Sequence, residues 1–129
     1  MKFTQQRPEG VNLIRRYGAD FISLDEDEIR ESCIVTATHF STWSPRSVDE
    51  LTAEHFLPLF ALRPEVVVLS TGVRQRFPRA ALRAEFATRK IGLEVMEIGA
   101  ASRTYNVLVS EERQVLAAIL LPGPSKGTE

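Results

Sequence analysis

The sequence predicts an α/β fold with a mixed central sheet and a βαβ crossover core. The apolar, β-branched run from Val66 to Leu69 lacks alternating polar positions, as is typical of a strand covered on both faces. A helical pattern follows Pro78, and a second apolar run, which we also expect to have no solvent face, extends from Leu93 to Ile98. This order of strand, helix and strand predicts parallel neighbours joined by a right-handed crossover. A third run, Val115 to Leu121, predicts one more buried strand.

The first third of the chain predicts an irregular lead-in followed by short strands. Residues 1–10 are polar and include proline and glycine, which disfavour regular structure. Short strands near Leu13 to Tyr17 and Phe21 to Leu24 are expected to form an antiparallel hairpin. The acidic run from Asp25 to Glu28 is expected at a hairpin tip or connection. The stretch from Cys33 to Trp43 is rich in β-branched residues and predicts a longer third strand.

Capping and proline signals predict the helices between these strands. Ser47 and Thr52 are both suitable N-caps for a helix that begins between them, and Pro58 should kink or shorten that helix by removing a backbone donor. Pro78 suits the first turn of the next helix, and Gly92 can adopt the left-handed C-cap after it.

Composition indicates one globular domain without a polyanion-binding surface. Of 129 residues, 43% are hydrophobic and 26% charged, and the net charge is −1, which disfavours nucleic-acid binding. We expect a single domain over residues 1–121 and a disordered tail over residues 122–129. The single cysteine, Cys33, excludes an internal disulfide, and the longest apolar run is too short to span a membrane. We therefore expect a soluble, cytoplasmic protein with no cofactor.

Several motifs together carry a family resemblance. They are the stretch from Leu93 to Leu108, the turn Ser70-Thr71-Gly72 after the first core strand, Trp43, and Glu111 with Arg113 ahead of the last strand. With these motifs the chain resembles the Mth-type domain family of small uncharacterised bacterial and archaeal proteins. Relatives of that family include a mitochondrial respiratory complex I assembly factor and an adipogenesis-associated cytosolic protein.

The resemblance covers the chain from about Asn12 to Leu121 and implies a three-layer α/β Mth-like fold with a mixed central sheet. It implies no established enzymatic activity. Two positions depart from the family pattern: Ser70 replaces the first glycine of a Gly-Thr-Gly turn, and Glu97-Ile98 stands where relatives often carry Asp-Thr. These departures leave the fold unaffected but put a shared ligand in doubt.

A candidate cleft follows from the predicted topology, because loops after parallel neighbours leave the same edge of a sheet. There, arginines bring positive charge and a helix beginning near Ala100 would offer N–H groups to an anion. The candidate ligand- or partner-binding residues are Ser70, Thr71, Gly72, Arg74, Arg76, Gly99, Ala100, Ser102, Arg103 and Asn106. In the alternative interpretation, the glycines only make tight turns, and Arg103 and Asn106 tie loops together by hydrogen bonds.

Catalytic and metal-binding patterns are weak. His39 and His55 lie on different expected elements without a partner at metal-ligand spacing, so we assign no metal site and no catalytic residue. The acidic run from Asp25 is the pattern of a solvated surface. Glu97, Arg103 and Tyr105 remain a possible proton-transfer set whose geometry the sequence does not define.

The distribution of charge favours docking to another macromolecule. Six basic residues and one acid lie between Arg74 and Lys90, whereas six acids and one base lie between Asp20 and Glu31. Such opposite patches favour a protein partner or a second copy of the chain, although a solvated helix face is the simpler explanation. We predict a non-enzymatic protein-interaction or assembly-factor-like module. The alternative is a small-anion-binding protein or unrecognised enzyme that uses the cleft at the carboxyl ends of the core strands.

Overall fold

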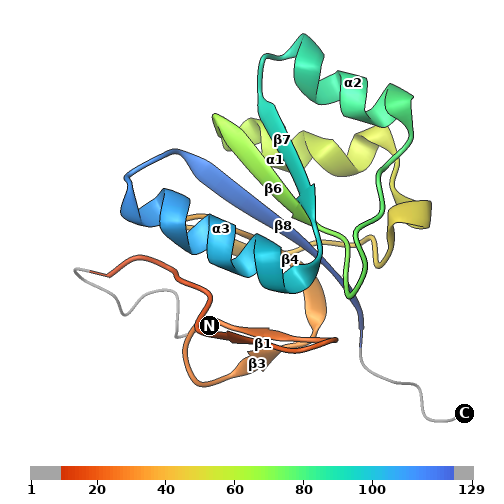
Figure 1. Cartoon of the computed structure of the whole chain (residues 1–129). Coiled ribbons are helices and arrows are strands. Elements are labelled where there is room, and N and C mark those ends of the chain that lie inside the picture. The colour runs from red at the N-terminus through yellow and green to blue at the C-terminus, as the bar shows by residue number, and fades with distance from the viewer. Residues whose placement is uncertain (1–9, 124–129) are drawn as a thin grey trace, which may run out of the picture.

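The computed structural model describes residues 10–123 and is built on a five-stranded mixed sheet in the order β5-β4-β8-β6-β7 (Figure 1). The strands are β4 Glu31–Val35, β5 Phe40–Thr42, β6 Val66–Ser70, β7 Gly92–Met96 and β8 Val115–Pro122. Both β7 and β8 run parallel to β6, whereas β4 runs antiparallel to β8 and to β5. The predicted mixed central sheet is confirmed.

The predicted crossover is also confirmed, since β6 and β7 are parallel neighbours joined through α2 (Ala80–Thr88). Strand β6 is buried along its whole length between β8 and β7. The expectation that the second strand also lacks a solvent face is wrong, because Gly92 and Glu94 of β7 are exposed. This strand lies at the edge of the sheet, and α3 (Ile98–Ser110) packs mainly over β6 and β8.

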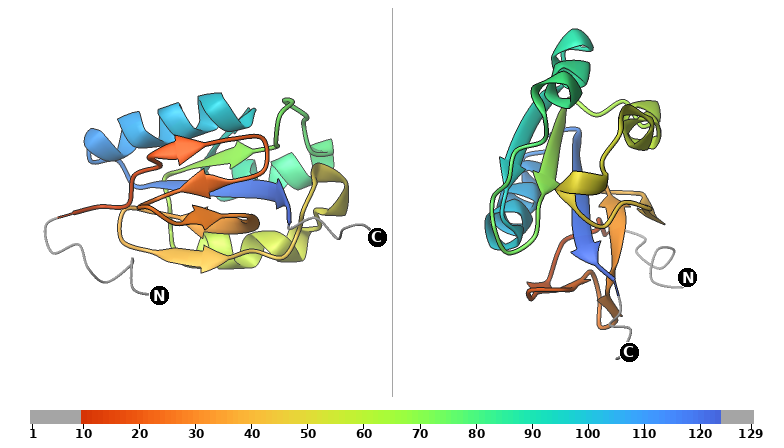
Figure 2. Two further views of the ribbon diagram at one scale, coloured as in Figure 1. Left: turned by 90° about the horizontal axis from the view of Figure 1, so that it is seen from below. Right: turned by 90° about the vertical axis from the view of Figure 1, so that its right-hand side faces the viewer.

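Two hydrophobic clusters cover the two faces of the sheet. Val66 and Val68 of β6 belong to the cluster that includes α3 and the N-terminal strands, whereas Val67 and Leu69 belong to the cluster that includes α1 (Leu57–Ala61) and α2. Figure 2 shows α3 and α1 on opposite sides of the sheet. The alternation of side chains along β6 therefore joins both outer layers to the centre, as the predicted three-layer arrangement requires.

A small antiparallel sheet, β1 Arg16–Tyr17, β2 Ile22–Ser23 and β3 Glu28–Ile29, packs beside α3. The predicted N-terminal hairpin is confirmed; Asp25, Glu26 and Asp27 lie in the β2–β3 connection, and Glu28 begins β3. The third strand of this sheet was not expected from the sequence.

The long strand predicted over residues 33–43 is wrong, because the chain turns back between β4 and β5. The Thr36 N–H donates to the carbonyl oxygen of His39 over 2.9 Å, and the Thr36 hydroxyl accepts from the His39 N–H over 3.0 Å. This local bonding by a threonine side chain competes with extension of the ladder. His39 consequently lies in a turn rather than on a strand.

Two helical predictions and the predicted end of the last strand need correction. The segment after Ser47 forms two 3₁₀ turns, η2 Val48–Glu50 and η3 Ala53–Phe56, before the short α1, which has Pro58 in its first turn. After α2 the left-handed conformation is adopted by Lys90, with φ of 60°, and Gly92 instead begins β7. The expectation of disorder from residue 122 is wrong for that residue, since Pro122 ends β8. Residues 1–9 and 124–129 lie outside the described range.

Candidate functional site between α3 and the N-terminal sheet

The carboxylate of Glu97 caps the first turn of α3. Glu97 is the N-cap, and its two carboxylate oxygens accept hydrogen bonds from the N–H groups of Gly99 and Ala100 over 2.7 and 2.9 Å. These bonds, with a smaller contribution from the charge of Arg103, lower the pKa of the Glu97 carboxyl. The helix begins at Ile98, so the expected start near Ala100 is corrected. The backbone donors proposed for an anion are already engaged.

The two predicted loops do meet at one edge of the sheet. The Thr71 N–H donates to the carbonyl oxygen of Met96 over 2.9 Å, and the Ile98 N–H donates to the carbonyl oxygen of Gly72 over 2.8 Å. Gly72 has φ of 102°, a conformation that favours glycine. The contact between these segments is therefore made by backbone groups, as the tight-turn interpretation expects.

Polar side chains fold the loop after β6 onto itself. The Thr71 hydroxyl donates to the carbonyl oxygen of Arg74 over 2.5 Å and accepts from the Arg76 N–H over 3.1 Å. The Arg76 guanidinium pairs with Asp49 over 2.8 Å. Ser70 is fully buried, and its hydroxyl has no hydrogen-bond partner among the described residues. Arg74 alone among these residues presents an exposed charge without a described partner.

The other half of the predicted residue set lies along α3 and faces the N-terminal sheet. Ser102 is buried and donates to the carbonyl oxygen of Ile98 over 2.8 Å, which is a contact within the helix. The Asn106 carboxamide accepts from the Ile14 N–H and donates to the Ile14 carbonyl oxygen, both over 2.9 Å. Asn106 therefore ties the strand-entry segment to α3, in agreement with the structural alternative.

Arg103 lies one turn before this tether and contacts a different residue. Its Nη1 donates to the phenol oxygen of Tyr17 over 3.0 Å at the surface. Tyr17 itself remains 42% exposed. A Cβ at position 99 would stand 2.9 Å from the Tyr17 phenol oxygen, so a side chain larger than hydrogen at Gly99 would displace the ring. The glycine thus allows Tyr17 to pack against the start of α3.

A hollow of about 490 Å³ opens between these elements. It is lined by Ile14, Arg15, Arg16, Tyr17, Phe21, Ser102, Arg103 and Asn106. The hollow joins three of the predicted residues to four polar or aromatic residues of the N-terminal sheet that the sequence did not single out. Their signal was the run Arg15-Arg16-Tyr17, which an ordinary edge strand would also explain.

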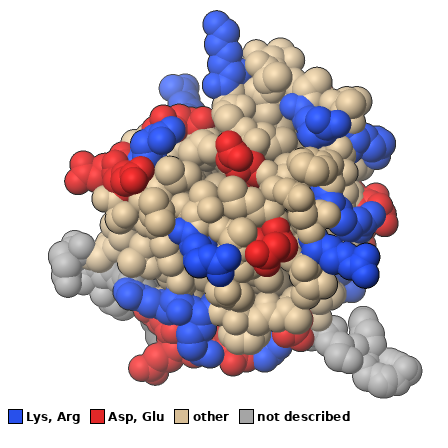
Figure 3. Space-filling model, viewed as in Figure 1, with Lys and Arg blue, Asp and Glu red and all other residues tan. Residues whose placement is uncertain are grey.

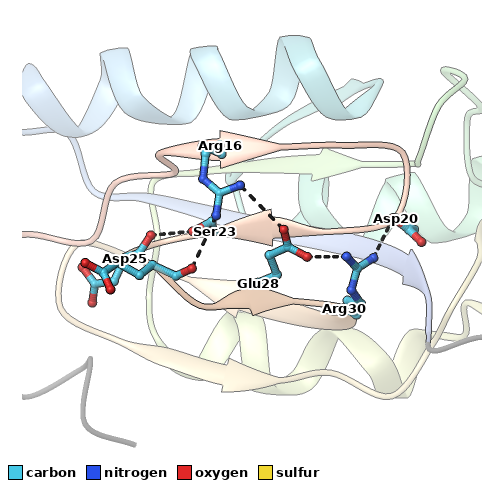
Figure 4. A network of polar contacts seen from close by, with 7 residues as sticks. Arg16, Asp20, Ser23, Asp25, Glu28 and Arg30 are labelled. Carbon is cyan, nitrogen blue, oxygen red and sulfur yellow. Dashed lines mark hydrogen bonds and ion pairs between the residues drawn. The ribbon is translucent and has the colours of Figure 1, made fainter.

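The arginines of the hollow differ in their partners. Arg16 pairs with Glu28 over 3.7 Å, and Glu28 in turn pairs with Arg30, as Figure 4 shows. Arg103 donates a hydrogen bond to Tyr17 and its charge acts on the Glu97 carboxyl, but it forms no ion pair within residues 10–123, and Arg15 is exposed without one there. The lining therefore carries positive charge that the described chain leaves open to a carboxylate or another oxyanion.

The titratable groups elsewhere are structural. The Tyr105 hydroxyl donates to the carbonyl oxygen of Asn12 over 2.8 Å in the core, where burial raises its pKa. Burial likewise raises the pKa of the Cys33 thiol. Glu97, Arg103 and Tyr105 have separate partners and do not assemble into a proton-transfer set. Among residues 10–123, His, Cys, Asp and Glu form no cluster of three or more suited to a metal ion.

Comparison with protein families identifies the chain. The model described as "Protein of unknown function (DUF498/DUF598)" matches residues 14–120. The chain belongs to this family. The match begins at Ile14 and ends at Leu120 in β8. It therefore includes every residue that lines the hollow.

Two relatives of this DUF498/DUF598 protein carry names. A zebrafish (Danio rerio) protein named "NADH dehydrogenase [ubiquinone] 1 alpha subcomplex assembly factor 3" is 28% identical over 94% of this chain and 70% of its own length. A Francisella tularensis protein named "13 kDa major membrane protein" is 22% identical over 93% of this chain and 99% of its own length. In the part of this chain that the structure describes, no helix combines the length and apolarity that a membrane span requires.

Solved structures agree with the fold. The solution structure of a Xanthomonas campestris protein is 34% identical, with a TM-score of 0.85, and the alignment covers 100% of this chain and 98% of that one. A Bordetella pertussis protein described as a Mth938-like domain is 24% identical, with a TM-score of 0.75 and coverage of 89% of both chains. The resemblance to Mth-type domains is confirmed.

Proposed function

We propose that this protein is a cytoplasmic, non-enzymatic interaction module of the assembly-factor type, and that it binds a protein partner at the hollow between α3 and the N-terminal sheet. The observation that carries the proposal is the pair formed by Arg103 and Tyr17, which lies exposed at the hollow. The name of the zebrafish relative supports an assembly role.

The composition of the hollow suits a protein interface. Arginine and tyrosine are enriched among the residues that contribute most to binding, because each combines a large contact area with directional hydrogen bonds. Tyr17 and the half-buried Phe21 supply aromatic surface beside the guanidinium groups of Arg15 and Arg103. The partner that fits this lining presents an aspartate or glutamate next to an apolar side chain.

The lining is held in place before a partner arrives. Asn106 fixes the backbone of Ile14 by two hydrogen bonds, and the Arg16–Glu28 pair links β1 to β3. The bond between Arg103 and Tyr17 limits the rotation of both side chains. Such preorganisation lowers the entropy lost when a partner binds.

A second candidate function is the binding of a small oxyanion in the same hollow. It is favoured by the two guanidinium groups, of Arg15 and Arg103, that lack a carboxylate partner among the described residues. The predicted edge site is less suited to this role, because Glu97 engages the first donors of α3. Isothermal titration with inorganic phosphate distinguishes the candidates. Saturable binding of phosphate would support the oxyanion site, whereas a protein interface does not need to bind free phosphate.

The experiment that tests the first candidate is site-specific photo-crosslinking in cells of the protein's own host. A photoreactive phenylalanine derivative replaces Phe21, which lines the hollow, in one variant and Ala84, which is exposed on α2, in the control. We expect one protein to be captured from position 21 and not from position 84, and capture should be lost when Arg103→Glu is added. Capture of a second copy of this chain would identify a homo-oligomer as the complex. Equal capture from both positions, or none that depends on Arg103, would contradict the proposal.

A further inference from the structure

The loop between β6 and α2 presents two large apolar side chains to solvent. Val73 is 64% exposed and Phe77 is 61% exposed, more than any other large hydrophobic residue described in the structure. Neither lies in the hollow beside α3. The two flank the stretch Arg74-Gln75-Arg76, and Arg79 follows, so apolar and basic residues alternate over a short segment without an acid. Exposed apolar residues in this setting indicate a contact surface.

Positive charge continues from the loop into α2. Arg83, Arg89 and Lys90 follow the loop arginines, and the single acid of this stretch, Glu85, is already paired with Arg89 over 3.0 Å. In Figure 3 several Lys and Arg side chains lie along the right-hand edge, and others lie at the top, centre and bottom of the same face. The loop and the start of α2 therefore present basic residues next to the two exposed apolar side chains.

Hydrogen bonds hold this loop in one shape. Gln75 donates from its side chain to the carbonyl oxygen of Val95 over 2.8 Å and so fastens the loop to the outer edge of β7. Arg83 donates from Nε to the carbonyl oxygen of Pro78 over 3.0 Å. With the Thr71 bonds described above, these contacts anchor the loop at both ends and in the middle. Val73 and Phe77 are exposed although the backbone beside them is well anchored.

We propose that this loop docks onto an anionic lipid surface, with Phe77 and Val73 entering the interface and Arg74 and Arg79 facing the phosphates. Peripheral binding of this kind combines a small buried apolar area with attraction of basic residues to anionic headgroups. The proposal concerns a surface separate from the hollow and is independent of the protein-interaction function.

Vesicle binding tests the proposal directly. The full chain is mixed with vesicles of phosphatidylcholine alone or of phosphatidylcholine with phosphatidylglycerol, and bound protein is separated by flotation. We expect binding only to the anionic vesicles, weakened by salt. Arg74→Gln should weaken it about fivefold, the value of one basic residue near an anionic surface. Phe77→Ser should weaken it about tenfold, because a partly inserted aromatic ring is lost.

Matched controls separate this loop from the rest of the surface. Val107→Ser changes an apolar residue that is 52% exposed on α3, and Arg63→Gln removes an exposed charge from the turn after α1. Both should bind anionic vesicles like the wild type. In a reporter variant, Phe77→Trp, tryptophan emission should shift to the blue on binding, against the constant background of the buried Trp43.

Three outcomes would overturn the proposal: no binding to anionic vesicles, equal losses in the loop and control variants, or no spectral shift in the Phe77→Trp variant despite binding. If the loop variants lose a cross-linked protein partner and vesicle binding is absent, the loop is a protein-docking surface instead. Melting temperatures of all variants are compared with that of the wild type. Because these side chains are exposed, the melting temperatures should be unchanged.

Discussion

Replacing Asn106 and Arg103 separately by alanine should separate fold from function. The Asn106 carboxamide makes two hydrogen bonds to the backbone of Ile14, each worth about 0.5–1.5 kcal/mol, and both backbone groups are left unpaired when it is removed. The expected loss is therefore about 2–4 kcal/mol. Arg103 makes one exposed hydrogen bond to Tyr17, so its loss should stay below about 1 kcal/mol.

Thermal and urea denaturation measure this difference. For a chain of this length, 1 kcal/mol corresponds to a change in melting temperature of about 4 °C, so Asn106→Ala should lower it by about 8–16 °C and Arg103→Ala by less than about 4 °C. Binding of the captured partner should be weakened by Arg103→Ala in fully folded protein. An equal or larger loss of stability in Arg103→Ala, with normal affinity in the folded fraction, would show that Arg103 is a tether and that the hollow is not the binding site.

Three further changes test other parts of the structure. Glu97→Gln should lower the melting temperature at neutral pH. Because hydrogen bonds hold the pKa of Glu97 in the folded protein below its usual 4.5, that stabilisation is present above this pH and is lost as the pH falls through the lowered pKa, so the melting curves of variant and wild type should converge in acid. Ser70→Ala should leave the melting temperature unchanged or raise it, since the buried hydroxyl has no described partner; a loss above about 1 kcal/mol would mean that the hydroxyl is bonded. Val68→Asp should abolish cooperative unfolding, because it buries an unpaired carboxylate at a cost of several kcal/mol, and a melt close to that of the wild type would contradict the burial of β6.

The core of the fold could be predicted because its signals are local and strong. The uninterrupted apolar runs of β6 and β8 report burial on both faces, and one amphipathic segment between β6 and β7 leaves a single common topology. The break between β4 and β5 was missed because Thr36 favours strands by propensity. Its hydroxyl instead makes local bonds that close a turn.

The candidate site was predicted only in part, because it depends on how distant segments dock. Arg103 and Tyr17 are 86 positions apart, and the sequence pattern of neither segment predicts that they are in contact. Glu97 was assigned to a strand because the apolar run continues to Ile98, yet its carboxylate caps α3 and engages the donors proposed for an anion. The edge predicted from topology exists and keeps the exposed charge of Arg74, but Arg103 and Asn106 lie on the other part of α3, where the small sheet packs.

A double-mutant cycle between Arg103 and the acidic residues of the cross-linked partner tests the central claim most directly. Dissociation constants are measured by titration for wild-type and Arg103→Ala protein, each against the wild-type partner and a partner with one carboxylate replaced by its amide. A positioned guanidinium–carboxylate contact predicts a coupling energy of at least about 1.5 kcal/mol for one carboxylate. Coupling near zero for every acidic residue of the partner, with both proteins fully folded, would show that Arg103 does not contact it and would contradict the assignment of the hollow as the binding site.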